Sequence, residues 1–241
     1  RGRPALNSRL GRLWQSLRTA GVGTTVGLIR KNLLHEFRGY LDGSFDRKYG
    51  TRTSGVVHLQ ELDIHSDNVR HGVYYEPTPT KVFLLILNNL GIRYEDFAYY
   101  DFGSGMGRTL LLASNFPFRE IVGIEFSERL HRRAVENIRI YRDPAQRCSS
   151  ITSLCLDATQ FALPPQAAVL FFYNPFEGPV MKAVLANIQR ACADQPRKVV
   201  LIYYNPLSAD LIDELGFLPH KRSLPLSHDY SRAMQRNVKG L

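Results

Sequence analysis

Apolar positions follow two different periods along the chain, and the change between them falls near residue 97. From there, short apolar runs such as FAYYDF (97–102), EIVGIEF (120–126) and AAVLFFYN (167–174) alternate with stretches in which apolar residues recur every three or four positions. The first pattern is typical of strands buried on both faces, and the second is typical of amphipathic helices. Regular alternation of the two predicts a mostly parallel sheet with helices on both faces.

The elements expected from this pattern fall between residues 97 and 205. Ser127 stands directly before an amphipathic stretch and is the expected N-cap of its helix. The residues after 205 can supply one more helix and two short strands, the last of them paired antiparallel. We predict strands at 97–103, 120–126, 153–158, 167–174 and 198–205, and helices at 107–116, 127–141 and 178–191.

The segment before residue 97 is organised differently. Amphipathic helical patterns cover residues 8–20 and 26–41, and DGSFDRKYGTRTSG (42–55) follows as a predicted loop. The Pro-rich run YYEPTP then leads into a helix, for which Thr80 is the expected N-cap.

Charge separates the two ends of the chain from its middle. Residues 1–55 hold 11 Lys/Arg against 3 Asp/Glu and residues 220–241 hold 5 against 1, whereas residues 56–219 hold 15 against 18. Basic ends attract an anionic partner such as nucleic acid or a ribonucleoprotein, although solvated helices give the same composition. We expect a basic helical N-terminal extension and cap over residues 1–72, and one α/β domain over residues 73–241.

Composition limits the class of protein. With 241 residues, 44% of them apolar, the chain is long enough to bury a full core. No run approaches the roughly 18 consecutive apolar residues of a membrane span. Cys148, Cys155 and Cys192 lack the CxxC or Cys/His spacing of metal sites, so we expect reduced thiols and no metal. A soluble, cytoplasmic protein is the expectation.

The stretch DFGSGMGR (101–108), which begins at the end of the strand predicted at 97–103, contains the clearest candidate chemistry. Gly103, Gly105 and Gly107 form G-x-G-x-G, whereas a dinucleotide fingerprint, G-x-G-x-x-G, has its third glycine one position later. Asp101 at the entrance repels a phosphate but can pair with an ammonium group. S-adenosyl-L-methionine has an amino group, a carboxylate and a sulfonium but no phosphate, so it suits this loop better than a nicotinamide cofactor does.

The run YYDFGSGMGR resembles motif I of the class I, seven-strand S-adenosylmethionine-dependent methyltransferases, and the resemblance extends over residues 74–205. It implies a Rossmann-like, seven-stranded, mostly parallel sheet with helices on both faces. In the family, the acidic residue that ends the second strand binds both ribose hydroxyls, and here it is Glu125. The family's Asp after the third strand accepts from the adenine amino group, and here it is Asp157, followed by Ala158 for backbone contacts. The motifs imply cofactor contacts from Asp101, Gly103, Ser104, Gly105, Gly107, Glu125, Phe126, Asp157 and Ala158.

A second resemblance concerns the segment before motif I. YYEPTPTKVFLLI is similar to the entry segment of seven-strand protein lysine methyltransferases, and together with FDRKYGTRTSG and DFGSGMGRTLLLAS it resembles a group of bacterial methyltransferase-like proteins. By this likeness Tyr75, Glu76 and Thr78 cover the methionine part of the cofactor. The alternative is a Pro-rich turn before a helix. The likeness implies a bacterial origin and gives no substrate.

The run FFYNPF (171–176), at the end of the fourth predicted strand, corresponds to the family's motif IV, which meets the methyl group. The carbonyls of Asn174 and Pro175 can accept hydrogen bonds from an amino group and direct its lone pair, and Phe176 can pack against a planar or cationic acceptor. With Tyr173, these residues are the predicted catalytic group, and a nitrogen such as that of a protein lysine is the expected acceptor. The family's N-P-P-[YF] has two prolines and this chain has one, so the acceptor type stays open.

Other functions and roles also stay open at this point. The single-proline motif and the basic ends fit a nucleic-acid methyltransferase acting on an exocyclic amine, and a non-catalytic binding protein can keep the same scaffold. Asp101 can cap a turn, Glu125 can be a solvated strand end, and Asp157 can form an Asx-turn. The candidate bases for a lysine acceptor are Glu76, Tyr75 and Tyr173.

Overall fold

The computed structural model describes residues 43–58, 68, 72, 74–206, 208–215, 222–224 and 238–240. In this part of the chain five strands pair in parallel: β1 (Ala98–Phe102), β2 (Ile121–Glu125), β3 (Ile151–Cys155), β4 (Ala168–Phe172) and β5 (Val199–Tyr203). Two short strands, β6 (Arg222–Leu224) and β7 (Val238–Gly240), extend the sheet through antiparallel pairing. The prediction of a Rossmann-like parallel sheet with helices is confirmed, with five parallel strands.

The sheet has the order β3-β2-β1-β4-β5-β7-β6, so the direction of strand addition reverses at β1. Asp101 of β1 lies in register with Gly123 of β2 on one side and with Phe171 of β4 on the other. In open α/β sheets, ligands bind beyond the carboxyl ends of the strands at such a reversal. The carboxyl end of β1 is therefore where a site is expected.

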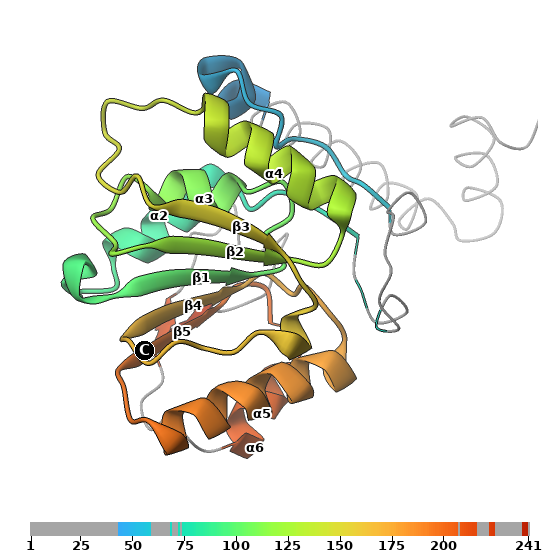
Figure 1. Ribbon diagram of the computed structural model, residues 1–241, viewed down its shortest axis with the longest axis vertical. Coiled ribbons are helices and arrows are strands. Elements are labelled where there is room, and N and C mark those ends of the chain that lie inside the picture. Colours follow the sequence, from blue (N-terminus) through green and yellow to red (C-terminus); the bar gives the residue numbers. More distant parts are fainter. Residues whose placement is uncertain are drawn as a thin grey trace, which may run out of the picture. The chain divides into compact units, whose positions relative to one another are not determined.

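Helices cover both faces of the sheet (Figure 1). Short 3-10 turns at Tyr94–Asp96 (η3) and Ala158–Gln160 (η4) complete the connections. One face carries α2 (Thr80–Asn88), α3 (Arg108–Ala113) and α4 (Glu128–Ile140), and the other carries α5 (Gly178–Asp194) and α6 (Ala209–Leu215). None of the helices that the structure describes has the length and apolar character of a membrane span.

Alternation of side chains along the strands separates two apolar cores, one on each face of the sheet. The first core joins strand residues Tyr99, Phe171 and Ile202 to helix residues such as Phe83, Leu87 and Leu111. The second joins strand residues Phe102, Leu170 and Phe172 to Met181, Leu185 and Ile188 of α5. Burial on both faces explains why the strands read as continuous apolar runs.

The helix starts test two local predictions. Ser127 caps α4 as expected, because its hydroxyl accepts from the N–H of Leu130. The prediction that Thr80 is an N-cap was wrong: α2 begins at Thr80 itself, and Pro79 is the capping residue. Proline in this position fixes a φ of −61°, which leads into the helix without a side-chain cap.

Two predicted boundaries are also corrected. The strand predicted at 153–158 runs from Ile151 to Cys155, because Asp157 leaves the sheet and caps η4. The loop predicted at 42–55 contains a helix over residues 43–49. That helix is stabilised by packing, since Phe45 is buried and stacks on Tyr141 at a centroid distance of 6.1 Å.

The expected N-terminal part lies largely outside the described residues. This includes the helical patterns at 8–20 and 26–41 and most of the basic residues at both ends. The chain separates into two units between Gly43 and Ser44. The extension over residues 1–72 and its role as a cap stay predictions.

Candidate active site

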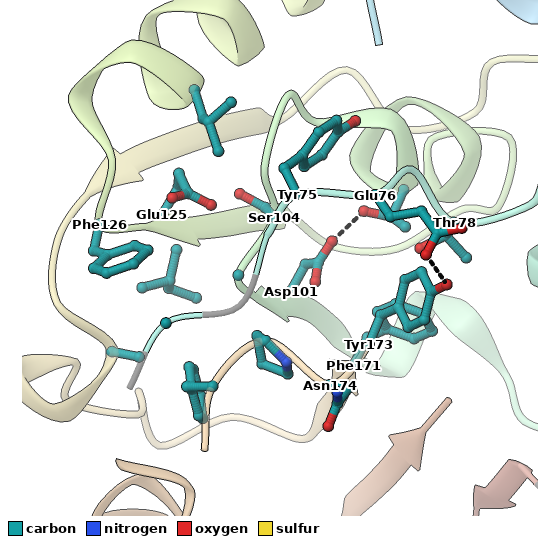
Figure 2. A pocket seen from close by; sticks show the side chains of 18 of the residues that line it. Tyr75, Glu76, Thr78, Asp101, Ser104, Glu125, Phe126, Phe171, Tyr173 and Asn174 are labelled. Carbon is teal, nitrogen blue, oxygen red and sulfur yellow. Dashed lines mark hydrogen bonds between the residues drawn. The ribbon is translucent and has the colours of Figure 1, made fainter. Parts of the chain in front are cut away.

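A pocket opens at the carboxyl ends of β1, β2 and β4, where the strand order reverses. About 900 Å³ of space lies between its walls, part of it open to solvent. Glu125 and Phe126 lie toward one end, and Glu76, Tyr173 and Asn174 lie toward the other, with Asp101 between them (Figure 2). An elongated ligand can therefore contact both groups.

Most of the residues predicted from the sequence line this pocket. They are Tyr75, Glu76, Thr78, Asp101, Gly103, Ser104, Glu125, Phe126, Asp157, Ala158, Tyr173, Asn174, Pro175 and Phe176. Gly105 and Gly107 do not line it. Gly107 is instead the N-cap residue of α3, and an added β-carbon there would lie 3.1 Å from the β-carbon of Ala134.

The glycine loop allows protein side chains to approach the backbone closely. Gly103 and Gly105 have φ angles of +80° and +55°, in the left-handed region that favours glycine. A β-carbon on Gly103 would lie 2.4 Å from the β-carbon of Pro175, and one on Gly105 would lie 2.1 Å from Cε2 of Tyr75. The glycines thus bring the end of β4 and the entry segment onto the loop.

The N–H groups of the loop donate to protein acceptors. Those of Gly103 and Ser104 donate to the carbonyl of Ile124 over 2.8 and 3.1 Å, and that of Gly107 donates to the carbonyl of Ser104 over 2.9 Å. The N–H of Gly105 donates to Oε2 of Glu125 over 2.8 Å. Phosphate-binding loops keep such groups for the ligand, so this loop is not built as a phosphate cradle.

Two carboxyl groups of the pocket are almost completely buried. Asp101 accepts a hydrogen bond from the hydroxyl of Thr109, and Glu125 accepts from the N–H of Gly105 and, over 2.9 Å, from that of Ser127. Burial raises the pKa of each carboxyl to about 7, although these hydrogen bonds act in the opposite direction. Because an ionised carboxylate has about four acceptor positions, Glu125 keeps acceptor capacity for a ligand hydroxyl beside these bonds and a further one from the N–H of Phe126.

Asp157 has a capping role within the protein. Its Oδ1 accepts from the N–H and the hydroxyl of Thr159, over 2.9 and 2.7 Å, and its Oδ2 accepts from Nδ2 of Asn68 over 2.9 Å. The Asx-turn considered from the sequence is therefore present. Both Asp157 and Asn68 also line the pocket, so capping does not remove the carboxylate from the site.

The end of β4 forms a tight corner. Asn174 has a left-handed φ of 45° directly before Pro175, and its Oδ1 lies 3.5 Å from the hydroxyl of Tyr203. Phe176 is buried, packs edge-on against Phe172, and forms a backbone bridge with Gly72. The corner thus joins the sheet to the segment that leads into the pocket wall.

Tyr173 and Glu76 meet on the pocket wall. The Tyr173 hydroxyl donates to Oε2 of Glu76 over 3.3 Å, although the two residues are far apart in sequence (Figure 2). Burial, followed by the nearby Glu76, raises the pKa of Tyr173 well above its ordinary value. Tyr173 is therefore a donor at neutral pH rather than a base.

Some residues of the site were not predicted from the sequence. Arg108 and Thr109 directly follow the glycines, but the motifs predict no site role for them. Asn68 and Gly72 lie in a region of the sequence without a periodic pattern. Arg108 is the one basic residue among the described lining residues, and Ser104 Oγ is buried there without a hydrogen-bond partner in the described part of the chain. The position of Arg108 directly after Gly107, at the start of a predicted helix, was the sequence signal that could have pointed to it.

Comparison with known proteins gives structural likenesses. No family model and no curated protein matches the chain. Among solved structures, the chain is similar to a precorrin-6y C5,15-methyltransferase from Geobacter metallireducens, with 15% identity, a TM-score of 0.47 and coverage of 68% of this chain and 82% of that one. An RNA methyltransferase from Salinibacter ruber in complex with S-adenosyl-L-homocysteine has 19% identity, a TM-score of 0.40 and coverage of 68% and 90%.

A third similar structure is the magnesium protoporphyrin IX methyltransferase from Synechocystis with bound S-adenosylmethionine. It has 12% identity and a TM-score of 0.44, with coverage of 67% of this chain and 74% of that one. Because these identities and TM-scores are low, we base the proposed function on the residues of the site.

Proposed function

We propose that the protein is a class I S-adenosylmethionine-dependent methyltransferase that transfers a methyl group to a nitrogen acceptor. One observation carries the proposal: four N–H groups of the loop donate within the protein, while the buried carboxyls of Asp101 and Glu125 face the pocket. Such a site disfavours phosphate groups and favours a ligand with hydroxyl and ammonium donors. S-adenosylmethionine has both donors and no phosphate.

The residues present fit this cofactor along the pocket. Glu125 would accept from the ribose hydroxyls and Asp157 from the adenine amino group, at the end where Phe126 and Ala158 add apolar contacts. Asp101 would pair with the ammonium group. Tyr75, Glu76 and Thr78 also line the pocket, and the methionine part would lie beside them. Ser104 Oγ, buried without a described partner, supplies a further hydrogen-bonding group.

The acceptor end of the pocket supports a nitrogen nucleophile. When bound, S-adenosylmethionine supplies an electrophilic methyl group on a sulfonium sulfur. The carbonyls of the Asn174–Pro175 corner can accept from an amino group and direct its lone pair toward the pocket. An amine attacks only when neutral, and the Glu76 carboxylate, held by Tyr173, is the acidic group at this end that can receive its proton. A protein lysine is the acceptor that we propose.

A nucleic-acid exocyclic amine is the second candidate. Exposed arginines stand in α4 (Arg129, Arg132 and Arg139) and directly after it (Arg142 and Arg147), and Arg132 pairs with the exposed Glu128 over 3.3 Å. Exposed arginines attract phosphate backbones, and the attraction weakens steeply with salt. The cytoplasmic location and bacterial origin expected from the sequence stay predictions.

Calorimetric titration of the full chain with S-adenosylhomocysteine tests the cofactor. We expect micromolar binding, about −8 kcal/mol, that is lost in Asp101→Ala and Glu125→Ala. Glu95→Ala, which changes an exposed carboxylate outside the pocket, is the matched control and should bind as the wild type does. Absence of binding to the wild-type protein would favour the non-catalytic scaffold.

A lysate screen with methyl-labelled cofactor then identifies the acceptor. Label that enters protein and is recovered as methyl-lysine supports the lysine acceptor. Label that enters RNA or DNA, with binding that weakens as salt is raised, supports the second candidate instead.

A further inference from the structure

Residues 45–54, which we call the strap, form a compact hydrogen-bonded unit around one carboxylate. Asp46 accepts from the hydroxyl of Thr51 over 2.7 Å, from the N–H and hydroxyl of Thr53 over 2.8 and 2.7 Å, and from the N–H of Ser54 over 2.7 Å. Thr51 and Thr53 are buried. The FDRKYGTRTS stretch, which we predicted as part of a loop, is therefore organised around the Asp46 carboxylate.

The strap holds Arg108, the first residue after the glycine loop. Arg108 is 1% exposed, and its Nε donates to the hydroxyl of Thr53 over 2.7 Å. Its Nη2 donates to the hydroxyl of Ser54 over 2.8 Å and lies 3.9 Å from Asp46, while Phe45 lies 5.2 Å from the guanidinium carbon. A buried guanidinium requires such partners, so the strap and the start of α3 depend on each other.

The same strap also holds the wall residue that covers the loop. The backbone carbonyl of Thr53 accepts from the hydroxyl of Tyr75 over 2.7 Å, and Val57 and Tyr75 exchange two backbone hydrogen bonds. The ring of Tyr75 lies against Gly105, whose N–H donates to Glu125. Thr53 is thus the common partner of Arg108 and Tyr75, and the chain of contacts ends at the carboxylate proposed for the ribose.

A second anchor ties the strap to the other side of the loop. Nδ2 of Asn137, a buried residue of α4, donates to the carbonyl of Met106 over 2.9 Å and to that of Arg52 over 3.1 Å. Its Oδ1 accepts from the N–H of Arg52 over 2.8 Å. The loop between Gly105 and Arg108 is therefore attached to the strap at both of its ends.

We propose that the strap is a positioning element for the cofactor: through Thr53 it fixes Arg108 and Tyr75, and so holds the glycine loop and Glu125 in the binding geometry. Arg108, Thr53 and Asp46 are then positioning residues that act without touching the cofactor's reacting atoms. The cofactor part of this inference rests on the proposed function. The hold of the strap on the loop can be measured without any ligand.

The test uses two mild substitutions and one matched control in the full chain. Thr53→Val removes the hydroxyl that joins Asp46 to Arg108, and Tyr75→Phe removes the hydroxyl that binds the Thr53 carbonyl. Thr51→Val is the control, because the Thr51 hydroxyl donates to Asp46 and makes no hydrogen bond to the glycine loop in the described part of the chain. Amide hydrogen exchange of residues 101–108 is measured without ligand, and S-adenosylhomocysteine affinity is measured by calorimetry.

We expect faster exchange across residues 101–108 in Thr53→Val and Tyr75→Phe than in the wild type and in Thr51→Val. We also expect S-adenosylhomocysteine binding to weaken about fivefold in each, in line with the loss of one buried hydrogen bond. In the double variant, the second substitution should reduce S-adenosylhomocysteine affinity by a smaller factor than it does alone, because both substitutions act through Thr53.

Unchanged exchange at 101–108 in both variants would overturn the strap proposal, whether or not the wild type binds S-adenosylhomocysteine. Equal loss of thermal stability in all three variants, with affinity at the wild-type level, would also overturn it, since a purely structural segment behaves in that way. A wild-type protein that binds no S-adenosylhomocysteine would contradict the proposed function, and the exchange result would still decide the role of the strap.

Discussion

Asn174 and Asn205 occupy equivalent corners at the ends of neighbouring parallel strands. Each follows a tyrosine and precedes a proline, and each has a left-handed backbone, with φ angles of 45° and 56°. The tyrosines before them, Tyr173 and Tyr204, lie side by side with ring centroids 4.7 Å apart. Asn174 lines the pocket, whereas Asn205 is outside it. Variants at the two corners can therefore distinguish the effect of backbone strain from a role of Asn174 in the pocket.

Glycine at either corner should be tolerated better than alanine. Left-handed φ costs a residue with a β-carbon about 1 kcal/mol, and glycine avoids this cost. We expect the free energies of unfolding of Asn174→Gly and Asn205→Gly to lie within about 1 kcal/mol of the wild-type value. Both alanine variants should be less stable than the glycine variants. Urea unfolding of the four variants measures this.

The corners should differ in methyl transfer. Asn174→Gly removes a carboxamide from the acceptor end, so transfer to the acceptor found in the lysate screen should fall at least about tenfold. Asn205→Gly should transfer at the wild-type rate. Equal losses in the two variants would indicate that the corners act only through the fold of the sheet.

Alanine at Gly105 should disrupt cofactor binding, because its methyl group would occupy the place of the Tyr75 ring. Gly91 is the matched control, since it has a φ of +67° and no atom within 4 Å of an added β-carbon. We expect Gly91→Ala to lose about 1 kcal/mol of stability and to bind S-adenosylhomocysteine normally. Gly105→Ala should bind at least about tenfold more weakly, and equal affinities would contradict the observed contact.

Stability without ligand should fall as pH rises toward neutrality. Burial raises the pKa of Asp101 from 3.8, and that of Glu125 from 4.5, to about 7 in the folded chain. Between the unfolded-state and folded-state pKa values, the folded chain binds protons that the unfolded chain has already released. The free energy of unfolding therefore falls as pH rises through this range. Asp101→Asn and Glu125→Gln should therefore be more stable than the wild type above pH 7, with no such gain below pH 4. Urea unfolding across this range measures the difference.

Cofactor affinity should change with pH in the opposite direction. Ionised Asp101 and Glu125 are better acceptors for an ammonium group and for hydroxyls than the protonated forms are. S-adenosylhomocysteine should therefore bind more tightly as pH rises through about 7, the pKa of both groups in the folded chain. A flat affinity profile would show that neither carboxyl changes its charge in the pocket.

Asp46 should show the reverse stability profile. Burial raises the pKa of Asp46, but hydrogen bonds from Ser54, Thr51 and Thr53 together lower it by more, so the pKa lies below its ordinary value of 3.8. A lowered pKa contributes stability that is present above 3.8 and is lost as pH falls through the folded value. Asp46→Asn should thus be less stable than the wild type at pH 7, and the difference should close in acid, as thermal unfolding can measure.

The sequence allowed much of the fold to be predicted because its signals are local. Alternating apolar runs and amphipathic stretches indicate the strands and helices, and the Ser127 hydroxyl caps α4 by accepting from an N–H only three residues away in the sequence. The errors arose where neighbours in space decide the outcome. Residues 43–49 are helical because Phe45 packs on Tyr141, and Asp157 ends its strand early by capping η4.

By itself, the sequence determined the order of strands and helices and placed Asp101, Glu125, Asp157 and Asn174 at the ends of predicted strands whose carboxyl ends meet in a parallel sheet. Only the tertiary structure decided what the glycines and Arg108 contact. Tyr75 lies on Gly105, Pro175 lies on Gly103, and Arg108 bonds to Thr53, which precedes it by 55 residues. Such contacts depend on how segments that are distant in the sequence pack together. A local sequence pattern therefore cannot predict them.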